Sequence, residues 1–186
     1  DLRVVRAWYE GASYHVNYEA VLACDRAWGD IGFGVPLTPR TRLAALAAEW
    51  AGVTNLTYIM AEEPDQLEFT LETMRRCEDR LYELLAEAPY PVVEIPDNLS
   101  AETMGGLWRC FSRDYYRQRI GRLHASGKKV GCHIDGTLGA LLGDLVEAGV
   151  DFPESVVPAP VGDLSLGKIR EAVGPHAIVW GGIPAA

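Results

Sequence analysis

The chain has 186 residues, of which 48% are hydrophobic and 23% are charged, and its formal net charge is −9. This length and composition are typical of a globular domain with an apolar core. The acidic balance argues against nucleic acid and anionic membranes as partners, because both bind basic surfaces. An anionic small molecule is compatible with it, since a local group of arginines can override the net sign.

The cysteines are few and widely spaced, and they form no CxxC pair: Cys24, Cys77, Cys110 and Cys132. At this size and density we expect no disulfide framework, and a reducing cytoplasm is the expected location. No signal-peptide pattern and no apolar run of membrane-spanning length are present. The first residue is Asp1 and not methionine, so we expect the natural start to lie upstream.

The first half of the chain mixes strand and helix patterns. Loose alternation predicts a strand over residues 2–8, and a short apolar run predicts another over 31–35. Residues 15–25 are ambiguous, with one apolar helical face. Residues 41–51 and 53–60 are helical in composition. Pro64 at a first helical position and an apolar stripe through Leu85 predict one long helix.

From residue 92 onward, strands and helices alternate. Strands are predicted at 92–95, 130–134, 152–157 and 177–180, with helices at 112–127, 137–149 and 164–173 between them. This alternation predicts a parallel sheet whose strands at Ile31, Val92, Val130, Phe152 and Ile178 lie adjacent in that order. The best fit is an α/β chain of the (β/α)8 TIM-barrel type. About six strands suggest a partial barrel, a single domain over 1–186 that lacks the first and last units.

Candidate site residues follow these strands. His133 and Asp135 are two residues apart at a strand end, so both side chains can face one ligand, although Asp-Gly is also a common turn. Asp97 follows the strand at 92–95, and Glu154 lies in the strand at 152–157. Because the carboxyl ends of parallel strands share one face, we expect Asp97, His133, Asp135, Glu154 and Gly181 to cluster there.

Two arginines lie at the mouth of the loop that follows residues 31–35. Arg40 and Arg42 can form an anion clamp, because guanidinium matches carboxylate geometry. A solvated helix start is the commoner role for such residues. Asp97 and Asn98 each have two interpretations: a turn residue, or a polar group directed into a pocket.

Four runs, in order and with fitting spacing, resemble the uroporphyrinogen decarboxylase family. They are Asp-Asn-Leu-Ser at 97–100, Gly-Lys-Lys-Val-Gly-Cys-His-Ile-Asp-Gly at 127–136, Leu-Val-Glu-Ala-Gly-Val-Asp at 145–151 and Val-Trp-Gly-Gly-Ile at 179–183. The family is a (β/α)8 barrel with its site at the C-terminal face, and it also contains the methylcobamide:coenzyme M methyltransferases.

The resemblance first implies a carboxy-lyase of porphyrin biosynthesis that acts on a tetrapyrrole or a related acid without a cofactor. Arg40 and Arg42 are then expected to hold substrate carboxylates. A buried acid, Asp97, Asp135 or Glu154, would stabilise a transient cation, with His133 as a further catalytic candidate. We expect additional substrate contacts from the strand-end residues Asn98, Trp180, Gly181 and Gly182. The arginine-rich N-terminal segment of the decarboxylases is not in this sequence.

The alternative is metal-dependent methyl transfer with a corrinoid protein as partner. The methyltransferases of the family carry a His-x-Cys zinc motif where this chain has His133 and Asp135, so zinc would be held by these two residues and Glu154. Such hard ligands would not favour a thiolate substrate. A third hypothesis is a truncated, non-catalytic barrel that only binds. An open barrel would expose sheet edges, which a homodimer could cover.

Overall fold

The computed structural model describes residues 1–183, and these form two compact units. The first unit comprises Asp1–Pro36 and Arg42–Tyr90, and the second comprises Leu37–Thr41 and the chain from Pro91 onward. The first unit is helical: α1 (Leu2–Gly11), α2 (Tyr18–Trp28), α3 (Arg42–Ala45), the π-helical segment η1 (Leu46–Trp50), α4 (Val53–Glu62), α5 (Pro64–Cys77) and α6 (Asp79–Glu87). No helix among residues 1–183 is long and apolar enough to cross a membrane.

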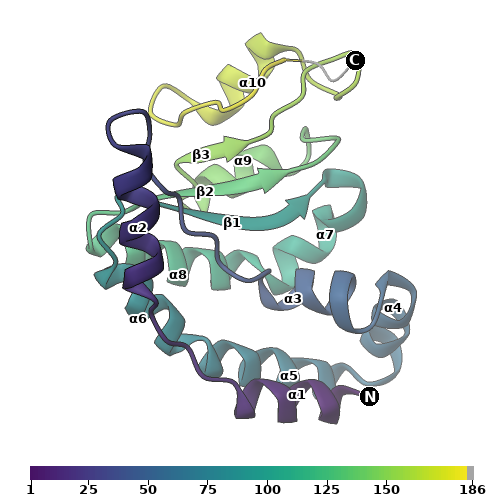
Figure 1. Cartoon of the computed structure of the whole chain (residues 1–186). Helices are drawn as coiled ribbons and strands as arrows, with labels where there is room; N and C mark the ends of the chain where they lie inside the picture. Colours follow the sequence, from purple (N-terminus) through teal and green to yellow (C-terminus); the bar gives the residue numbers. More distant parts are fainter. Residues whose placement is uncertain (184–186) are drawn as a thin grey trace. The chain divides into compact units, whose positions relative to one another are not determined.

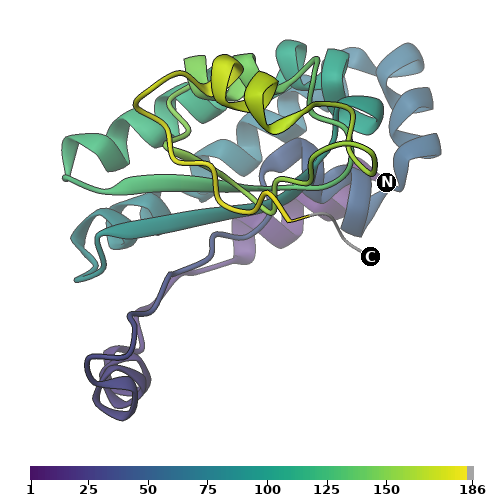
Figure 2. The same cartoon turned by 90° about the horizontal axis from the view of Figure 1, so that it is seen from above.

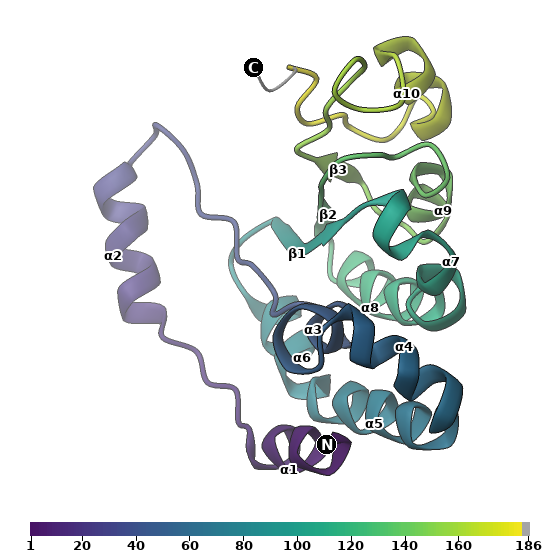
Figure 3. The ribbon, with the colours of Figure 1, turned by 90° about the vertical axis from the view of Figure 1, so that its right-hand side faces the viewer.

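The strand predicted over residues 2–8 is wrong, because this segment is the helix α1. Its buried residues Leu2, Val5 and Tyr9 are spaced by three and four, which is the period of a helix and not of a strand. Asp1 caps the helix by accepting a hydrogen bond from the backbone N–H of Arg3 at 3.0 Å. Figures 1 and 3 both show α1 running beside α5.

The strand predicted over 31–35 is also wrong. Ile31 is 91% exposed and Phe33 is 56% exposed, so the apolar run that suggested a buried strand is on the surface. Pairing begins only at Leu37, which forms one isolated parallel bridge with Glu94 in the second unit. The ambiguous segment before it forms α2, in which no residue is buried.

The long helix predicted from Pro64 is present but divided. Leu67, Leu71 and Met74 are buried in α5, as the apolar stripe predicts. The division lies at Glu78, where α5 ends and α6 begins. Glu78 donates its N–H to the carbonyl of Met74 at 3.0 Å, so the hydrogen bonding continues across the break.

The second unit is a small parallel sheet with helices. Its three strands are hydrogen-bonded in the order β1-β2-β3, which confirms an α/β arrangement and the predicted adjacency of these strands. Figures 2 and 3 show the helices of this unit gathered on one face of the sheet. Its elements are β1 (Val92–Leu99), α7 (Ala101–Phe111), α8 (Arg113–Ala125), β2 (Lys129–Ile134), α9 (Leu142–Glu147), β3 (Phe152–Glu154) and α10 (Leu166–Val173).

Two helices of this unit differ from the prediction. Helix α7, which the prediction lacks, begins after Ser100, whose hydroxyl accepts a hydrogen bond from the N–H of Thr103 at 3.2 Å. Helix α9 begins at Leu142 and not at Thr137. The amides of Leu138 and Gly139 donate to the carboxylate of Asp163 instead, at 2.8 and 2.9 Å, and a turn precedes the helix.

The segment predicted as a strand at 177–180 is extended and lies beside β3. Ile178 donates its N–H to the carbonyl of Asp151 at 2.8 Å, and Trp180 donates to Pro153 at 3.1 Å. A single parallel bridge joins Val156 to Gly181, so the segment has the predicted direction and neighbour but is not a regular strand. Gly181 has φ +125, a conformation that only glycine adopts readily.

Strand β1 is longer than predicted and irregular. The pairing with β2 is continuous from Val92 to Ile95 and resumes at Leu99 with a shifted register. Pro96 lies in this stretch; it has no backbone N–H, and its carbonyl accepts a hydrogen bond from Arg40 at 2.9 Å on the edge away from β2. The irregular part contains Asp97 and Asn98, two of the predicted site residues.

Candidate functional site

The face of the sheet opposite α8 carries a group of polar residues. The register pairs Glu94 with Gly131 on β2, and it pairs His133 with Glu154 on β3. Paired residues of parallel strands point to the same face, as do residues two apart on one strand. The side chains of Glu94, His133 and Glu154 therefore lie on one face, each on a different strand.

These three side chains are close enough to bind one ion together. One nitrogen of His133 and one carboxylate oxygen each of Glu94 and Glu154 lie within 4.8 Å of one another. The Nδ1 atom of His133 is hydrogen-bonded to Oε2 of Glu154. The side chains of His133 and Glu154 are 28% and 22% exposed, so the group is accessible from solvent.

The surroundings of Glu94 favour its uncharged form. Burial raises the pKa of Glu94, and the charge of Glu154 and the hydrogen bond between the two carboxyl groups raise it further, while His133 acts in the opposite direction. A cation bound between the two carboxyl groups would offset the repulsion of their charges.

A chain of hydrogen bonds extends from this group along the same end of the sheet. Oδ1 of Asp135 lies 3.4 Å from Nε2 of His133, and Oδ2 of Asp135 accepts a hydrogen bond from the Asn98 amide at 2.6 Å. Arg40 donates to Oδ1 of Asn98 at 3.2 Å and to the carbonyl of Pro96 at 2.9 Å. Both nitrogens of His133 therefore face carboxylates, and Arg40 supplies a positive charge near the end of the chain.

Two residues beside this group have an unusual backbone. Asn98 has φ 52 and Ser155 has φ 65, and both are outside the region that most non-glycine residues occupy. Ser155 directly follows Glu154, and Asn98 contacts Asp135. Such conformations cost about 1–3 kcal/mol each and are common at functional sites, so they support a functional role for this end of the sheet.

Asp97 lies on the other face of the sheet, against α8. It is 5% exposed. Its carboxylate accepts hydrogen bonds from the N–H and the hydroxyl of Thr41, and from the hydroxyl of Tyr116 at 2.6 Å. Burial raises the pKa of Asp97, while these hydrogen bonds act against that shift. Asp97 and His133 both lie near the ends of their strands, but on opposite faces of the sheet, and Asp97 fixes residues 37–41 to β1.

The remaining predicted residues have structural contacts. Arg42 belongs to the first unit and donates to the carbonyl of Leu71 at 2.9 Å, so the structure assigns Arg40 and Arg42 to different units. Trp180 packs against Phe152 with ring centroids 5.5 Å apart. A Cβ atom at Gly181 would lie 2.6 Å from backbone atoms of Val156, so this glycine permits the close approach of the two segments.

Sequence reasoning identified His133, Asp135 and Glu154, and the structure brings these three together. Glu94 was not predicted as a site residue, because it was expected only to be part of the buried strand at 92–95. A signal for Glu94 is present in the sequence: a glutamate stands between Val93 and Ile95, in the middle of an apolar run. A charged residue is rarely buried without a partner, so this position indicates a polar neighbour on one face of the strand.

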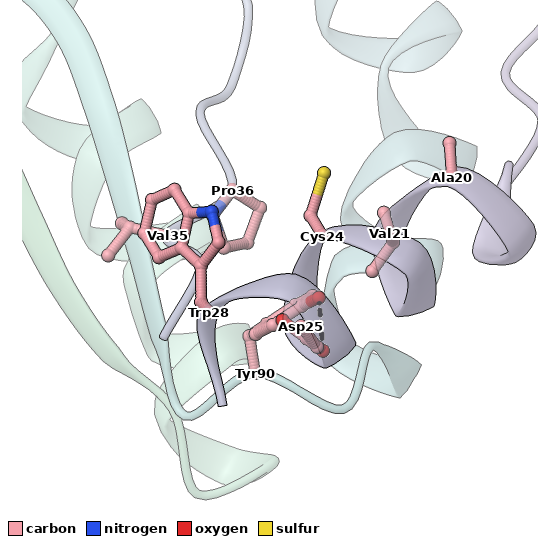
Figure 4. Close-up of a pocket in the computed structure, with 9 residues that line it drawn as sticks. Ala20, Val21, Cys24, Asp25, Trp28, Val35, Pro36 and Tyr90 are labelled. Atoms are coloured by element: carbon pink, nitrogen blue, oxygen red, sulfur yellow. Dashed lines mark hydrogen bonds between the residues drawn. The ribbon is translucent and has the colours of Figure 1, made fainter. Parts of the chain in front are cut away.

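The first unit has a separate apolar pocket of about 270 Å³ on helix α2. Figure 4 shows that Val21, Cys24 and Trp28 of α2 line it together with Pro36. Tyr90 donates a hydrogen bond to Asp25 at 2.8 Å at its rim. This pocket contains no group of metal-ligating or paired acid–base side chains, so the polar group on the sheet is the better candidate for chemistry.

No family model matches the chain, and no curated protein sequence matches it. A solved structure has a similar fold: a methyltransferase from Methanosarcina mazei matches with a TM-score of 0.63 at 19% identity. The match covers 91% of this chain and 51% of that chain, so this chain spans about half the length of that methyltransferase. At this identity the likeness shows a common fold alone.

Proposed function

We propose that this chain belongs to a metal-dependent enzyme that transfers a methyl group, on a partial (β/α)8 barrel to which both units contribute as one domain over residues 1–186. The observation that carries the proposal is the group of Glu94, His133 and Glu154 at adjacent parallel strands. The methyltransferase of similar fold supports the reaction class. The resemblance of 127–136 to the uroporphyrinogen decarboxylase family, which includes methyltransferases, supports the same choice.

The residues present fit a divalent metal ion. One imidazole and two carboxylates are usual ligands of zinc, at about 2.0–2.2 Å. One nitrogen of His133 and one oxygen each of Glu94 and Glu154 lie within 4.8 Å of one another. Two acids and an imidazole this close together suit zinc or a similar divalent ion.

When bound, the metal would act as a Lewis acid that polarises the group to which the methyl is added or from which it is removed. The residues of the chain have their own roles. Asp135 orients the His133 ring from the Nε2 side, and Asn98 holds Asp135 in place. Arg40 lies at the end of this chain, where it would attract an anionic part of the substrate.

The proposed partner is a corrinoid protein, which would carry the methyl group.

The carboxy-lyase hypothesis receives less support from the geometry. It assigns Asp97 a role in stabilising a substrate cation, but Asp97 is directed to Thr41 and Tyr116 on the α8 side. It also assigns Arg40 and Arg42 to one clamp, but Arg42 is bonded to the backbone of α5.

Metal binding tests the proposal. The purified protein should take up about one zinc or cobalt ion per chain in equilibrium dialysis, and His133→Ala, Glu154→Gln and Glu94→Gln should each weaken binding by tenfold or more. His15→Ala is the matched control, since His15 is exposed and lies outside the group. Circular dichroism must show that the variants are folded. Uptake that does not change in His133→Ala would overturn the proposal.

A further inference from the structure

The ligand atoms on this face of the sheet are oxygen and nitrogen, without sulfur. On β2, Cys132 stands between Gly131 and His133 and therefore points to the opposite face. It is fully buried, and its sulfur lies 3.6 Å from the hydroxyl of Tyr116 on α8. The other cysteine of this unit, Cys110, is on helix α7.

Negative charge is already concentrated around the group. Glu94 and Glu154 together neutralise a divalent cation, and Asp135 adds a further carboxylate 3.4 Å from His133. Glu94, His133 and Glu154 are partly buried, where charges are less screened than in water, whereas the side chain of Asp135 is 54% exposed. A thiolate on the metal would add another negative charge beside these acids. An uncharged oxygen ligand would leave the charge of the site unchanged.

The same ligand set favours oxygen on chemical grounds. Carboxylate and imidazole ligands suit harder divalent ions, whereas sites that bind thiolates are rich in sulfur ligands. The electrostatic argument rests on the charges of Glu94, Glu154 and Asp135, the ligand-softness argument rests on the ligand atoms of Glu94, His133 and Glu154, and the two agree.

We propose that the substrate of this site binds the metal through an uncharged oxygen, as an alcohol or an ether, and not as a thiolate. This inference rests on the proposed metal-dependent function and names the substrate class of that same site. Within it, Glu94 determines specificity: its carboxylate on β1 supplies the second negative charge that excludes a thiolate.

The test uses the cobalt(II)-loaded protein and two matched probes, 2-mercaptoethanol and ethylene glycol. A thiolate on cobalt(II) gives a near-ultraviolet charge-transfer band, and an oxygen ligand shifts the visible bands. We expect ethylene glycol to shift the visible bands in a saturable way and 2-mercaptoethanol to give no charge-transfer band. In Glu94→Gln, which removes one negative charge, 2-mercaptoethanol should give the band at a concentration at least tenfold below any that affects the original protein.

The outcomes separate the two proposals. Failure to bind cobalt refutes the proposed function itself. Stoichiometric cobalt with an intense thiolate band in the original protein leaves the metal site intact and overturns the substrate class. A Glu94→Gln protein that binds cobalt but resists the thiol as strongly as the original overturns the role of Glu94. Asp114→Asn serves as the control for removal of a negative charge, since Asp114 lies on α8 with its side chain 89% exposed.

Discussion

Replacing Tyr116 by phenylalanine should destabilise the protein, because it removes one donor from a buried carboxylate. Tyr116 is fully buried, and its hydroxyl donates to Asp97 at 2.6 Å. A hydrogen bond to a charged group contributes about 1.5–3 kcal/mol, and the hydroxyl of Thr41 still donates to the same carboxylate oxygen, so no acceptor is left unpaired. We expect the free energy of unfolding to fall by about 1.5–3 kcal/mol. With a urea dependence of roughly 2 kcal/mol/M, the unfolding midpoint falls by about 1 M.

The control is Tyr58→Phe, because the side chain of Tyr58 is largely exposed, with the residue at 62%. A surface change of this kind alters stability by no more than about 0.5 kcal/mol. Urea unfolding followed by circular dichroism measures both variants. A Tyr116→Phe midpoint no lower than that of Tyr58→Phe would refute the view that Asp97 depends on this hydroxyl.

The pH dependence of the same site has a definite sign. Burial raises the pKa of Asp97 above its ordinary value of 3.8. Between that value and the raised pKa, the native state keeps a proton that the unfolded chain has lost. The contribution of Asp97 to stability therefore decreases as the pH rises through this window.

Three further changes test other parts of the second unit. Gly131→Ala places a methyl group against the ring of Phe152 and should cost about 1–3 kcal/mol in a urea or thermal melt, whereas Gly143→Ala, in open space within α9, should stabilise by up to about 1 kcal/mol. Asp151→Asn should cost about 1–3 kcal/mol at pH 7, because Asp151 accepts hydrogen bonds from a lysine, a histidine and a backbone N–H. Burial alone would raise the pKa of Asp151, but these hydrogen bonds lower it, so its contribution is present above 3.8 and is lost as the pH falls through the native pKa. Gly181→Ala should release residues 178–182 from β3, seen as faster amide hydrogen exchange at those positions.

Each of these changes has a result that contradicts its basis. Equal melting of the Gly131 and Gly143 variants would mean that the Phe152 ring moves aside freely. A stability difference between Asp151→Asn and the original protein that persists unchanged at pH 2 would exclude ionisation of Asp151 as its cause. Unchanged exchange in Gly181→Ala would show that the backbone there tolerates a side chain.

The strands of the second unit were predictable because each is a short apolar run bounded by turn residues. The same criterion failed for residues 31–35, since a local pattern cannot show whether an apolar run finds a partner. It also failed at the N-terminus, where Leu2, Val5 and Tyr9 are spaced for a helix but lie among other apolar residues that imitate alternation. Turn chemistry at 138–141 depends on Asp163, which is 25 residues away from Leu138, so the start of α9 was not predictable from local sequence.

The candidate site was predictable to the extent that it depends on strand ends. His133 and Asp135 share a face by simple alternation, and Glu154 pairs with His133 across the sheet. Glu94 was missed because its partner comes from β3, and this contact requires the register of all three strands. The position of Asp97 was misjudged because the strand was expected to end at Ile95; it continues to Leu99, and simple alternation places Asp97 on the buried face with Val93, Ile95 and Leu99.

Pro96 also affects how the outer edge of β1 meets other chains. On that edge, the backbone pairing among residues 1–183 is the bridge from Leu37 to Glu94, and the side chains of Arg40 and Thr41 bind the strand beyond it. An edge that offers a continuous row of N–H donors can recruit a strand from another molecule and seed aggregation. Pro96 has no donor, and side-chain contacts take the place of a regular ladder. An incoming strand would therefore find few regularly spaced backbone groups with which to pair. Pro96 and the contacts to residues 37–41 thus make this edge a poor template for intermolecular strand addition.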